Sequence, residues 1–289
     1  MGEVIVGSDA VSAGILTRGQ LRWNYRQLYP DVYIAKDVEP TLAVRARGAW
    51  LWSNRRGVIT GRAAAAIHGA KWVDAACPIE MLWSNNRPPD GIITRRERIA
   101  PGEITYRAGI PVATPARAAL DLGRKLRGDN AVAHLDALSN ATGVTATEIL
   151  ALAERYKGTN GVRKCRESVD LMDAGAQSPK ETWLRLLLID DGFPRPVTQI
   201  PLIDHTGYKF AYLDMGWPEL KIAVEYDGEH HRTDTEQYRS DARRLRKILA
   251  QGWIHIRVIT GDRRKEICSR VDDAWQLRQS EGMVVKMPA

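Results

Sequence analysis

The first 75 residues show short helical patterns around one predicted hairpin. Pro30 and Asp31 lie among aromatic and β-branched residues, which is typical of a tight turn between two strands. Thr17 has the side chain of a helix N-cap. The predicted helices before and after the hairpin cover residues 18–23, 41–53 and 62–68. We therefore predict a small domain of short helices and a hairpin over residues 1–75.

From residue 76 the pattern changes to strands and then to helices. Apolar residues alternate at Ile79, Met81 and Trp83, which predicts a strand. Pro115 follows Thr114 at the position where proline is favoured in the first turn of a helix. Helical patterns cover residues 116–126 and, in three short pieces, residues 130–173. We predict a mixed middle segment over residues 76–173, with β-structure first and helices after it.

The last third has the pattern of an α/β sandwich. Ser178 and Glu181 match a capping box with proline at the first helical position. The predicted elements follow the order α-β-β-β-α-β-α and cover residues 178–190, 197–203, 209–215, 220–227, 235–250 and 253–259, with a last helix from residue 264. This order predicts one α/β sandwich over residues 174–289. The whole chain is thus expected to be an α+β or α/β protein.

Helix 235–250 is predicted to be amphipathic. The apolar side chains that we expect to face the sheet are Tyr238, Ala242, Leu245 and Leu249. The basic side chains on its other face are Arg239, Arg243, Arg246 and Lys247. A basic face of this kind can contact phosphates, or it can be an ordinary solvated surface.

Three carboxylates are predicted to meet beside strand 220–227. Because side chains alternate along a strand, Glu225 and Asp227 share one face. A tight turn after the preceding strand would place Asp214 opposite Ala223 and diagonal to Glu225. Carboxylates in this arrangement suit a hard cation such as Mg²⁺ or Mn²⁺. We therefore predict Asp214, Glu225 and Asp227 as candidate metal ligands.

Two further residues extend this predicted site. His231 follows the strand closely and has a side chain suited to general acid or base catalysis. Glu181 lies on the flank of an apolar helical stripe, where it could face the site, although its place in a capping box explains it equally well. If the domain is an active enzyme, the candidate catalytic residues are Asp214, Glu225, His231 and Glu181.

The charge balance favours a polyanionic partner. The chain has 42 Lys and Arg against 35 Asp and Glu, a net charge of +7, and residues 1–110 alone hold 15 basic against 10 acidic residues. The basic residues that we predict to contact DNA are Arg18, Arg22, Arg26, Arg45, Arg55, Arg56 and Arg62 in the first third, and Arg243, Arg246 and Lys247 in the last. A solvated basic surface without a ligand is the alternative.

Cysteine usage and hydropathy narrow the class of protein further. Cys77, Cys165 and Cys268 form no CxxC pair, which argues against a thiolate zinc site and against a disulfide scaffold. No run of about 18 apolar residues occurs, and the first residues lack the pattern of a signal peptide. We expect a cytoplasmic protein without a membrane segment. The sequence leaves the oligomeric state open.

The last third resembles a nuclease family. The strings AVEYDGEHH, DARR and GWIHIRV are similar to the very-short-patch-repair (Vsr)-like endonucleases of the PD-(D/E)xK superfamily, over residues 178–260. The resemblance implies a restriction-endonuclease-like fold. The roles that it implies are metal binding for Asp214 and Glu225, an upstream acid for Glu181 and a catalytic histidine for His231. The lysine that the superfamily carries two residues after the second acid is absent, and Asp227 stands there.

The first part resembles the winged-helix N-terminal region of AbiEi-family antitoxins. The strings that carry the resemblance are AGILTRGQLR, RQLYPDVYIA, ITGRAAAAIHG and GIPVATPARAALDL, over roughly residues 10–125. The resemblance implies a winged helix-turn-helix domain that binds promoter DNA. It also implies a nucleotidyltransferase-like toxin as partner.

Three functions are compatible with these patterns. The leading hypothesis is a protein that binds double-stranded DNA, a promoter-binding antitoxin or transcriptional regulator of a toxin–antitoxin pair that is not an enzyme and needs no cofactor. The second is an endonuclease that depends on Mg²⁺ or Mn²⁺ and is targeted by the winged helix. The third is a protein-interaction module that uses the nuclease fold only as a scaffold.

Overall fold

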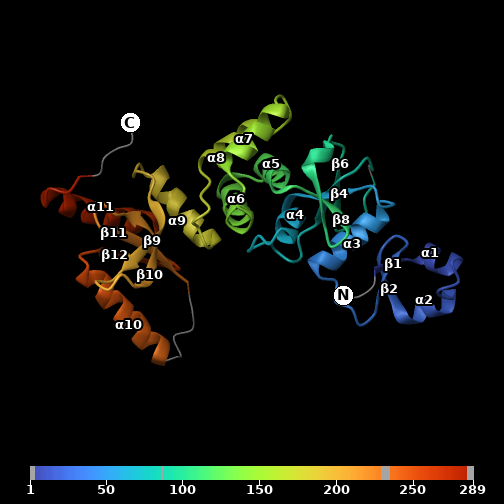
Figure 1. The fold of residues 1–289 in the computed structure, drawn as a ribbon, viewed down its shortest axis with the longest axis horizontal. Helices are drawn as coiled ribbons and strands as arrows, with labels where there is room; N and C mark the ends of the chain where they lie inside the picture. Colours follow the sequence, from blue (N-terminus) through green and yellow to red (C-terminus); the bar gives the residue numbers. More distant parts are fainter. Residues whose placement is uncertain (1–3, 86, 229–234, 285–289) are drawn as a thin grey trace. The chain divides into compact units, whose positions relative to one another are not determined.

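The chain is a mixed α/β protein with two compact units, residues 1–172 and 173–289. In the computed structural model, residues 4–85, 87–228 and 235–284 are described, and the side chains of residues 235–238 are left undescribed. This part of the chain contains three sheets and eleven α-helices (Figure 1).

The first unit begins with a small helix-and-sheet module. Its elements are β1 (Val4–Val6), α1 (Gly7–Ser12), α2 (Arg18–Asn24), β2 (Tyr25–Tyr29) and β3 (Val32–Ala35). The three strands pair in the order β1-β3-β2, and both pairings are antiparallel. The predicted hairpin is confirmed, with Pro30 and Asp31 at its turn. The predicted N-cap is also confirmed, because Thr17 forms a capping box with Gln20.

The rest of the first unit is built on a five-stranded sheet. Its elements are α3 (Leu42–Trp52), β4 (Val58–Thr60), α4 (Gly61–Ile67), β5 (Ile79–Leu82), β6 (Ile92–Arg95), β7 (Ile104–Arg107) and β8 (Ile110–Ala113), with the strand order β6-β5-β4-β8-β7. The central strand β4 pairs with β5 and β8. The sheet therefore joins segments that we had predicted as separate, residues 1–75 and 76–173.

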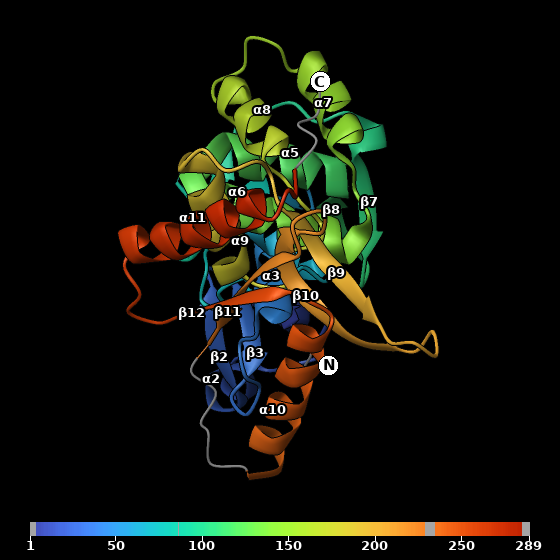
Figure 2. The same cartoon turned by 90° about the vertical axis from the view of Figure 1, so that its left-hand side faces the viewer.

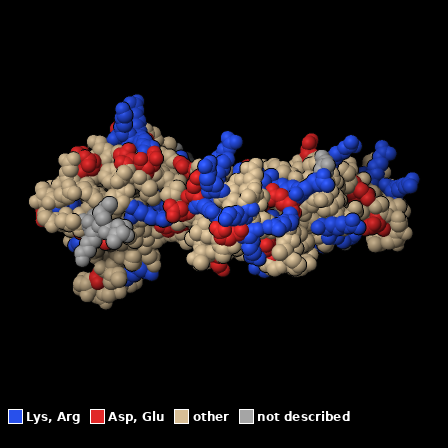
Figure 3. All heavy atoms as spheres, turned by 90° about the horizontal axis from the view of Figure 1, so that it is seen from above, with Lys and Arg blue, Asp and Glu red and all other residues tan. Residues whose placement is uncertain are grey.

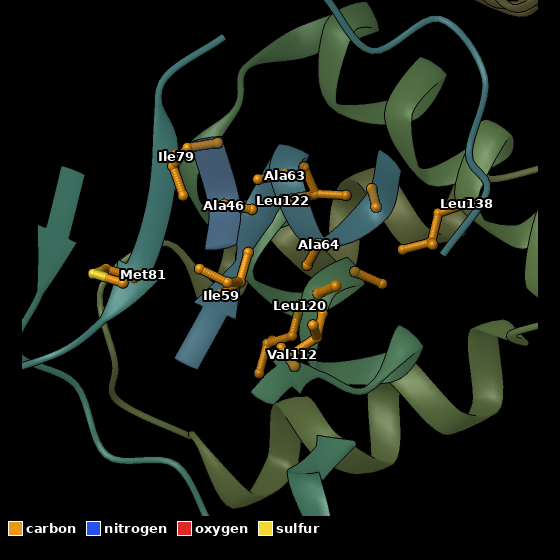
Figure 4. Close-up of a cluster of buried hydrophobic side chains, with 14 of the residues drawn as sticks. Ala46, Ile59, Ala63, Ala64, Ile79, Met81, Val112, Leu120, Leu122 and Leu138 are labelled. Atoms are coloured by element: carbon orange, nitrogen blue, oxygen red, sulfur yellow. The ribbon is translucent and has the colours of Figure 1, made fainter. Parts of the chain in front are cut away.

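Four helices complete the first unit, and they are α5 (Pro115–Lys125), α6 (Gly128–Thr142), α7 (Ala146–Arg155) and α8 (Val162–Asp170). Their apolar side chains join those of the sheet in one core. Figure 4 shows Ile59 of β4 and Val112 of β8 beside Leu120 and Leu122 of α5. Small alanines of α4, Ala63 among them, let this helix lie close to the sheet.

The second unit contains a four-stranded sheet between helices. Its elements are α9 (Pro179–Asp190), β9 (Val197–Ile203), β10 (Lys209–Trp217), β11 (Ile222–Asp227), α10 (Thr235–Ala250), β12 (Ile254–Ile259) and α11 (Arg264–Ser280). The strand order is β12-β11-β10-β9, and only β11 and β12 run parallel. The unit has two hydrophobic cores, one on each face of the sheet. Side chains of α9 and α11 lie in one core and Ile248 of α10 lies in the other, so α9 and α11 cover one face of the sheet and α10 covers the opposite face (Figures 1 and 2). The predicted order of elements is confirmed.

The register of β10 and β11 corrects our prediction. Gly216, and not Asp214, pairs with Ala223. The loop between the strands comprises residues 218–221, two residues more than the predicted tight turn. A shift of two residues keeps each side chain on its face, because the strand period is two. It carries Asp214 along the strand to the level of Glu225.

The buried face of α10 also differs from the predicted one. Leu245 and Leu249 are 39% and 51% exposed, whereas Ile248 is fully buried. Arg244 lies on the same side as Ile248 and reaches Glu225 of the sheet. Tyr238, which we predicted to be buried, lies outside the described side chains.

Candidate functional site

Three carboxylates converge beside the C-terminal half of β11 in the second unit. Asp214 of β10, Glu225 of β11 and Glu181 from the first turn of α9 are close enough to influence one another's protonation. Glu181 is buried, and its carboxylate accepts hydrogen bonds from the backbone N–H of Gln177 at 2.8 Å and from the Ser178 hydroxyl at 2.9 Å. The N-cap of α9 is Ser178, whose hydroxyl accepts from the Glu181 N–H, while the Glu181 carboxylate binds the residues before the helix and faces the acidic cluster.

Asp214 is the carboxyl group that this environment perturbs most. Burial, followed by the charges of Glu181 and Glu225, raises the pKa of Asp214 to about 7. One hydrogen bond favours its charged form, because the Tyr226 amide donates to its Oδ2 atom at 3.2 Å. This carboxyl group therefore titrates far closer to neutral pH than an ordinary aspartate.

Glu225 is held by two basic side chains. Arg244 donates to both carboxylate oxygens, at 2.6 and 3.1 Å, and Nε2 of His255 lies 2.6 Å from Oε2. Burial alone would raise the pKa of Glu225, but the hydrogen bonds from His255 and Arg244 outweigh it and hold the pKa below its ordinary value. Neither basic residue was among the predicted site residues, although both lie in the strings that carry the nuclease resemblance.

The remaining predicted ligands do not complete a metal site. Asp227 forms an ion pair with Arg257 of β12. His231 lies outside the described residues. Within the described part of the chain, no group of three or more His, Cys, Asp or Glu side chains could hold a metal ion. With both oxygens of Glu225 occupied by Arg244 and His255, the described residues do not fit Mg²⁺ or Mn²⁺ as they stand.

The predicted DNA-binding residues of the first unit fall into two groups. Arg18 and Arg22 are exposed on α2, next to Trp23, whose side chain is 74% exposed. Arg56 is exposed as well, and Arg55 is exposed and lies 3.3 Å from Asp9.

Three other arginines of this unit are used within the fold. Arg26 donates to the Val38 carbonyl, and Arg45 donates to the carbonyls of Ala75 and Cys77. Arg62 lies 3.5 Å from Glu80. Among the predicted DNA-binding residues of the first unit, α2 therefore carries two exposed arginines, Arg18 and Arg22. Figure 3 shows why charge alone cannot select it: on the face in view, basic side chains of both units are interspersed with acidic ones.

The predicted basic residues of α10 are all exposed. Arg246 donates to the Ala242 carbonyl of its own helix, and Nζ of Lys247 lies 5.1 Å from the centre of the Phe210 ring. Arg243 completes this exposed basic face. The face lies in the second unit, and Arg244 turns away from it toward Glu225.

Residues 57–170 match the family model of the AbiEi antitoxin C-terminal domain. The matched segment runs from just before β4 to the end of α8 and implies a component of a toxin–antitoxin pair. It begins later than the resemblance noted in the sequence, and it concerns the C-terminal domain of that antitoxin family and not its winged helix.

The similarity to known proteins extends beyond this domain. Two uncharacterized proteins of Mycobacterium tuberculosis, MT2308 of strain CDC 1551 / Oshkosh and Rv2248 of strain H37Rv, are each 29% identical over 243 residues. The aligned region spans 83% of this chain and 87% of each relative. No solved structure shows significant similarity to the chain.

No helix in the described part of the chain is both long and apolar enough to span a bilayer. All three cysteines are buried and free.

Proposed function

We propose that this protein is a DNA-binding antitoxin that regulates the promoter of its own toxin–antitoxin pair. The domain match at residues 57–170 supports the toxin–antitoxin role, and the exposed basic surface of α2 supports DNA binding. The proposal goes beyond the match, because the matched segment does not include α2.

The module over β1 to β3 has the parts of a winged helix. Two short helices, α1 and α2, follow strand β1, and the β2–β3 hairpin follows α2 directly. In this arrangement α2 is the helix for the major groove and the hairpin is the wing on the backbone. The observation that carries the proposal is the exposure of Arg18, Arg22 and Trp23 on a helix whose start is fixed by the Thr17 capping box.

The partner of such an antitoxin is a toxin, and the family resemblance points to a nucleotidyltransferase-like enzyme. Co-expression tests this role: the full chain should restore growth to cells that express its cognate nucleotidyltransferase-like toxin. A variant with Arg18→Ala and Arg22→Ala should still neutralise the toxin while losing promoter repression. Failure of the wild-type chain to neutralise the toxin would refute the antitoxin role.

For the second unit we propose a Vsr-like, restriction-endonuclease-like fold without cleavage activity. The supporting features are the order of its elements and the parallel pairing of β11 with β12 across α10. The contacts of Arg244 and His255 with Glu225 argue against catalysis, because they occupy the oxygens that a metal ion would need. The endonuclease hypothesis therefore requires Arg244 to leave Glu225.

A further inference from the structure

The fold gives no reason for a glycine at Gly19, the second residue of helix α2. Among the described residues, a Cβ atom at this position would meet only the Thr17 hydroxyl oxygen within 4 Å, at 3.8 Å, which is an ordinary contact. The φ of Gly19 is not positive, so the backbone does not require glycine either. Glycine also weakens a helix relative to alanine. A molecule that approaches the helix closely would explain the missing side chain.

Trp23 lies on the same face of α2 as Gly19. The two residues are four positions apart, which places them one above the other on a helix. Leu21 is the half-buried residue of α2, and Trp23 lies about 200° from it around the helix axis. The indole ring therefore points away from the module that carries it, and its side chain is 74% exposed. It offers a large apolar surface beside a position that has no side chain.

Positive charge runs along one side of this face. Arg18 and Arg22 are also four positions apart, both are exposed, and each directly precedes a residue of the Gly19–Trp23 pair. The seven residues of α2 include no acidic side chain. The start of the helix is fixed, because the Thr17 N–H donates to the side chain of Gln20 at 2.8 Å. The helix thus presents two cations, a gap and a flat ring on an ordered backbone.

We propose that the Gly19–Trp23 face reads thymine in the major groove, with the Trp23 ring against the C5-methyl group. This inference rests on the proposed role of α2 as the helix that enters the groove. Among the four bases, thymine alone presents a methyl group there, and apolar side chains contact it. The missing side chain at Gly19 lets the helix approach the base edges. Arg18 and Arg22 complement the phosphates that border the groove.

The test uses the full chain and two forms of its own promoter duplex, one made with thymine and one with uracil, which lacks the C5-methyl group. The wild type should bind the uracil duplex about 4-fold more weakly for each methyl group that Trp23 covers. Trp23→Ala should bind the thymine duplex more weakly than the wild type does, and it should bind both duplexes equally. Its unfolding temperature should match the wild type, since the ring is exposed.

Two further variants make the result specific. Trp72→Ala removes a 59% exposed tryptophan of the same unit outside α2, and it should keep the wild-type preference for thymine. Gly19→Ala should unfold at or above the wild-type temperature, because alanine favours the helix. The same variant should bind the thymine duplex about 5-fold or more weakly, because its added methyl group holds the helix away from the bases. A purely structural role for Gly19 would not separate stability from binding in this way.

A preference for thymine that is equal in Trp23→Ala and the wild type would overturn the proposal, and so would wild-type binding that ignores the methyl group. A change of oligomeric state in free Trp23→Ala would assign the ring to a contact between copies and would also overturn it. If Arg18→Ala with Arg22→Ala leaves duplex binding unchanged, the proposed role of α2 fails and this inference fails with it. If that variant binds weakly while Trp23→Ala still prefers thymine, only this inference fails.

Discussion

The backbone of Gly61 has a positive φ and lies against the carboxylate of Glu80. Its φ is +60°, and a Cβ atom there would lie 2.6 Å from Oε1 of Glu80. Glu80 is itself buried, and Arg95 holds it at 2.5 Å. The glycine thus lets a buried carboxylate approach the start of α4.

Replacing Gly61 by alanine should therefore destabilise the first unit by about 1–3 kcal/mol, from the positive φ and the contact together. Denaturant unfolding of the full chain measures this loss. The matched control is Gly143→Ala, at φ +73° with no atom within 4 Å of the added Cβ. If both substitutions lower the free energy of unfolding by the same amount, the contact with Glu80 contributes nothing to the cost at Gly61.

Asp214 should make stability depend on pH. An ordinary aspartate in the unfolded chain has a pKa near 3.9, whereas folding raises the pKa of Asp214 to about 7. Between these values the folded state binds more protons than the unfolded state, so the free energy of unfolding falls as pH rises toward 7. The Asp214→Asn substitution removes the ionisable group, and with it this loss of unfolding free energy at higher pH.

We therefore expect Asp214→Asn to raise the unfolding temperature at pH 8 and to have a smaller effect at pH 5. The pH 8 gain should be on the order of a few kcal/mol at most. Asp273→Asn, at an exposed position of α11, serves as the control and should show no such pH dependence. Parallel pH profiles for wild type and Asp214→Asn would contradict the raised pKa.

At the scale of elements, helix α5 is tied to its surroundings by a buried arginine. The side chain of Arg117 is fully buried, and it contacts Glu103 at 2.7 Å, Asp121 at 3.0 Å and the Tyr156 hydroxyl at 2.6 Å. Glu103 precedes β7, and Tyr156 follows α7. One guanidinium group therefore links a helix, a sheet and a second helix inside the matched antitoxin domain.

Replacing Arg117 by methionine should cost about 3–5 kcal/mol, because it leaves buried carboxylates unpaired. Arg117→Lys should not restore stability, since an ammonium group cannot reach three partners at once. Thermal unfolding measures both. Arg163→Met, in an exposed pair with Glu167, is the control and should cost less than about 1 kcal/mol. A wild-type unfolding temperature for Arg117→Met would show that the network is dispensable.

Most helices and strands are predictable from the sequence because their signals are local. Thr17, Thr114 and Ser178 each accept a hydrogen bond from the backbone N–H three residues later, as their helix starts suggest. Strand β4 is an exception, since three residues are too short for an alternating pattern. Its place at the centre of a sheet is decided by its neighbours, β5 and β8.

The sequence predicted which carboxylates would form the candidate site, but not that Arg244 and His255 would contact Glu225. Face alternation correctly places Asp214 near Glu225, even though the loop length shifted the register by two residues. The predicted inward face of α10 was wrong because a contact between the helix and the sheet, from Arg244 to Glu225, outweighs the apolar spacing of the helix. Such contacts join residues far apart in sequence, and helical periodicity does not report them.

At the scale of the whole molecule, the contacts of Glu225 predict indifference to divalent metals. Millimolar Mn²⁺ should leave the unfolding temperature of the wild type unchanged, because Arg244 and His255 occupy the carboxylate. Arg244→Ala should lower that temperature and make it respond to Mn²⁺. A wild-type increase with Mn²⁺ that Glu225→Gln abolishes would restore the endonuclease hypothesis.

The central claim is that α2 brings this protein to DNA, and a mobility-shift titration of the full chain on its own promoter duplex tests it most directly. The Arg18→Ala, Arg22→Ala variant should bind more weakly, with the salt slope reduced by about 1.8 for two lost phosphate contacts. Arg163→Ala with Lys164→Ala removes the same charge from α8 and should retain the wild-type slope. Equal binding and equal slopes for the two variants would contradict the account.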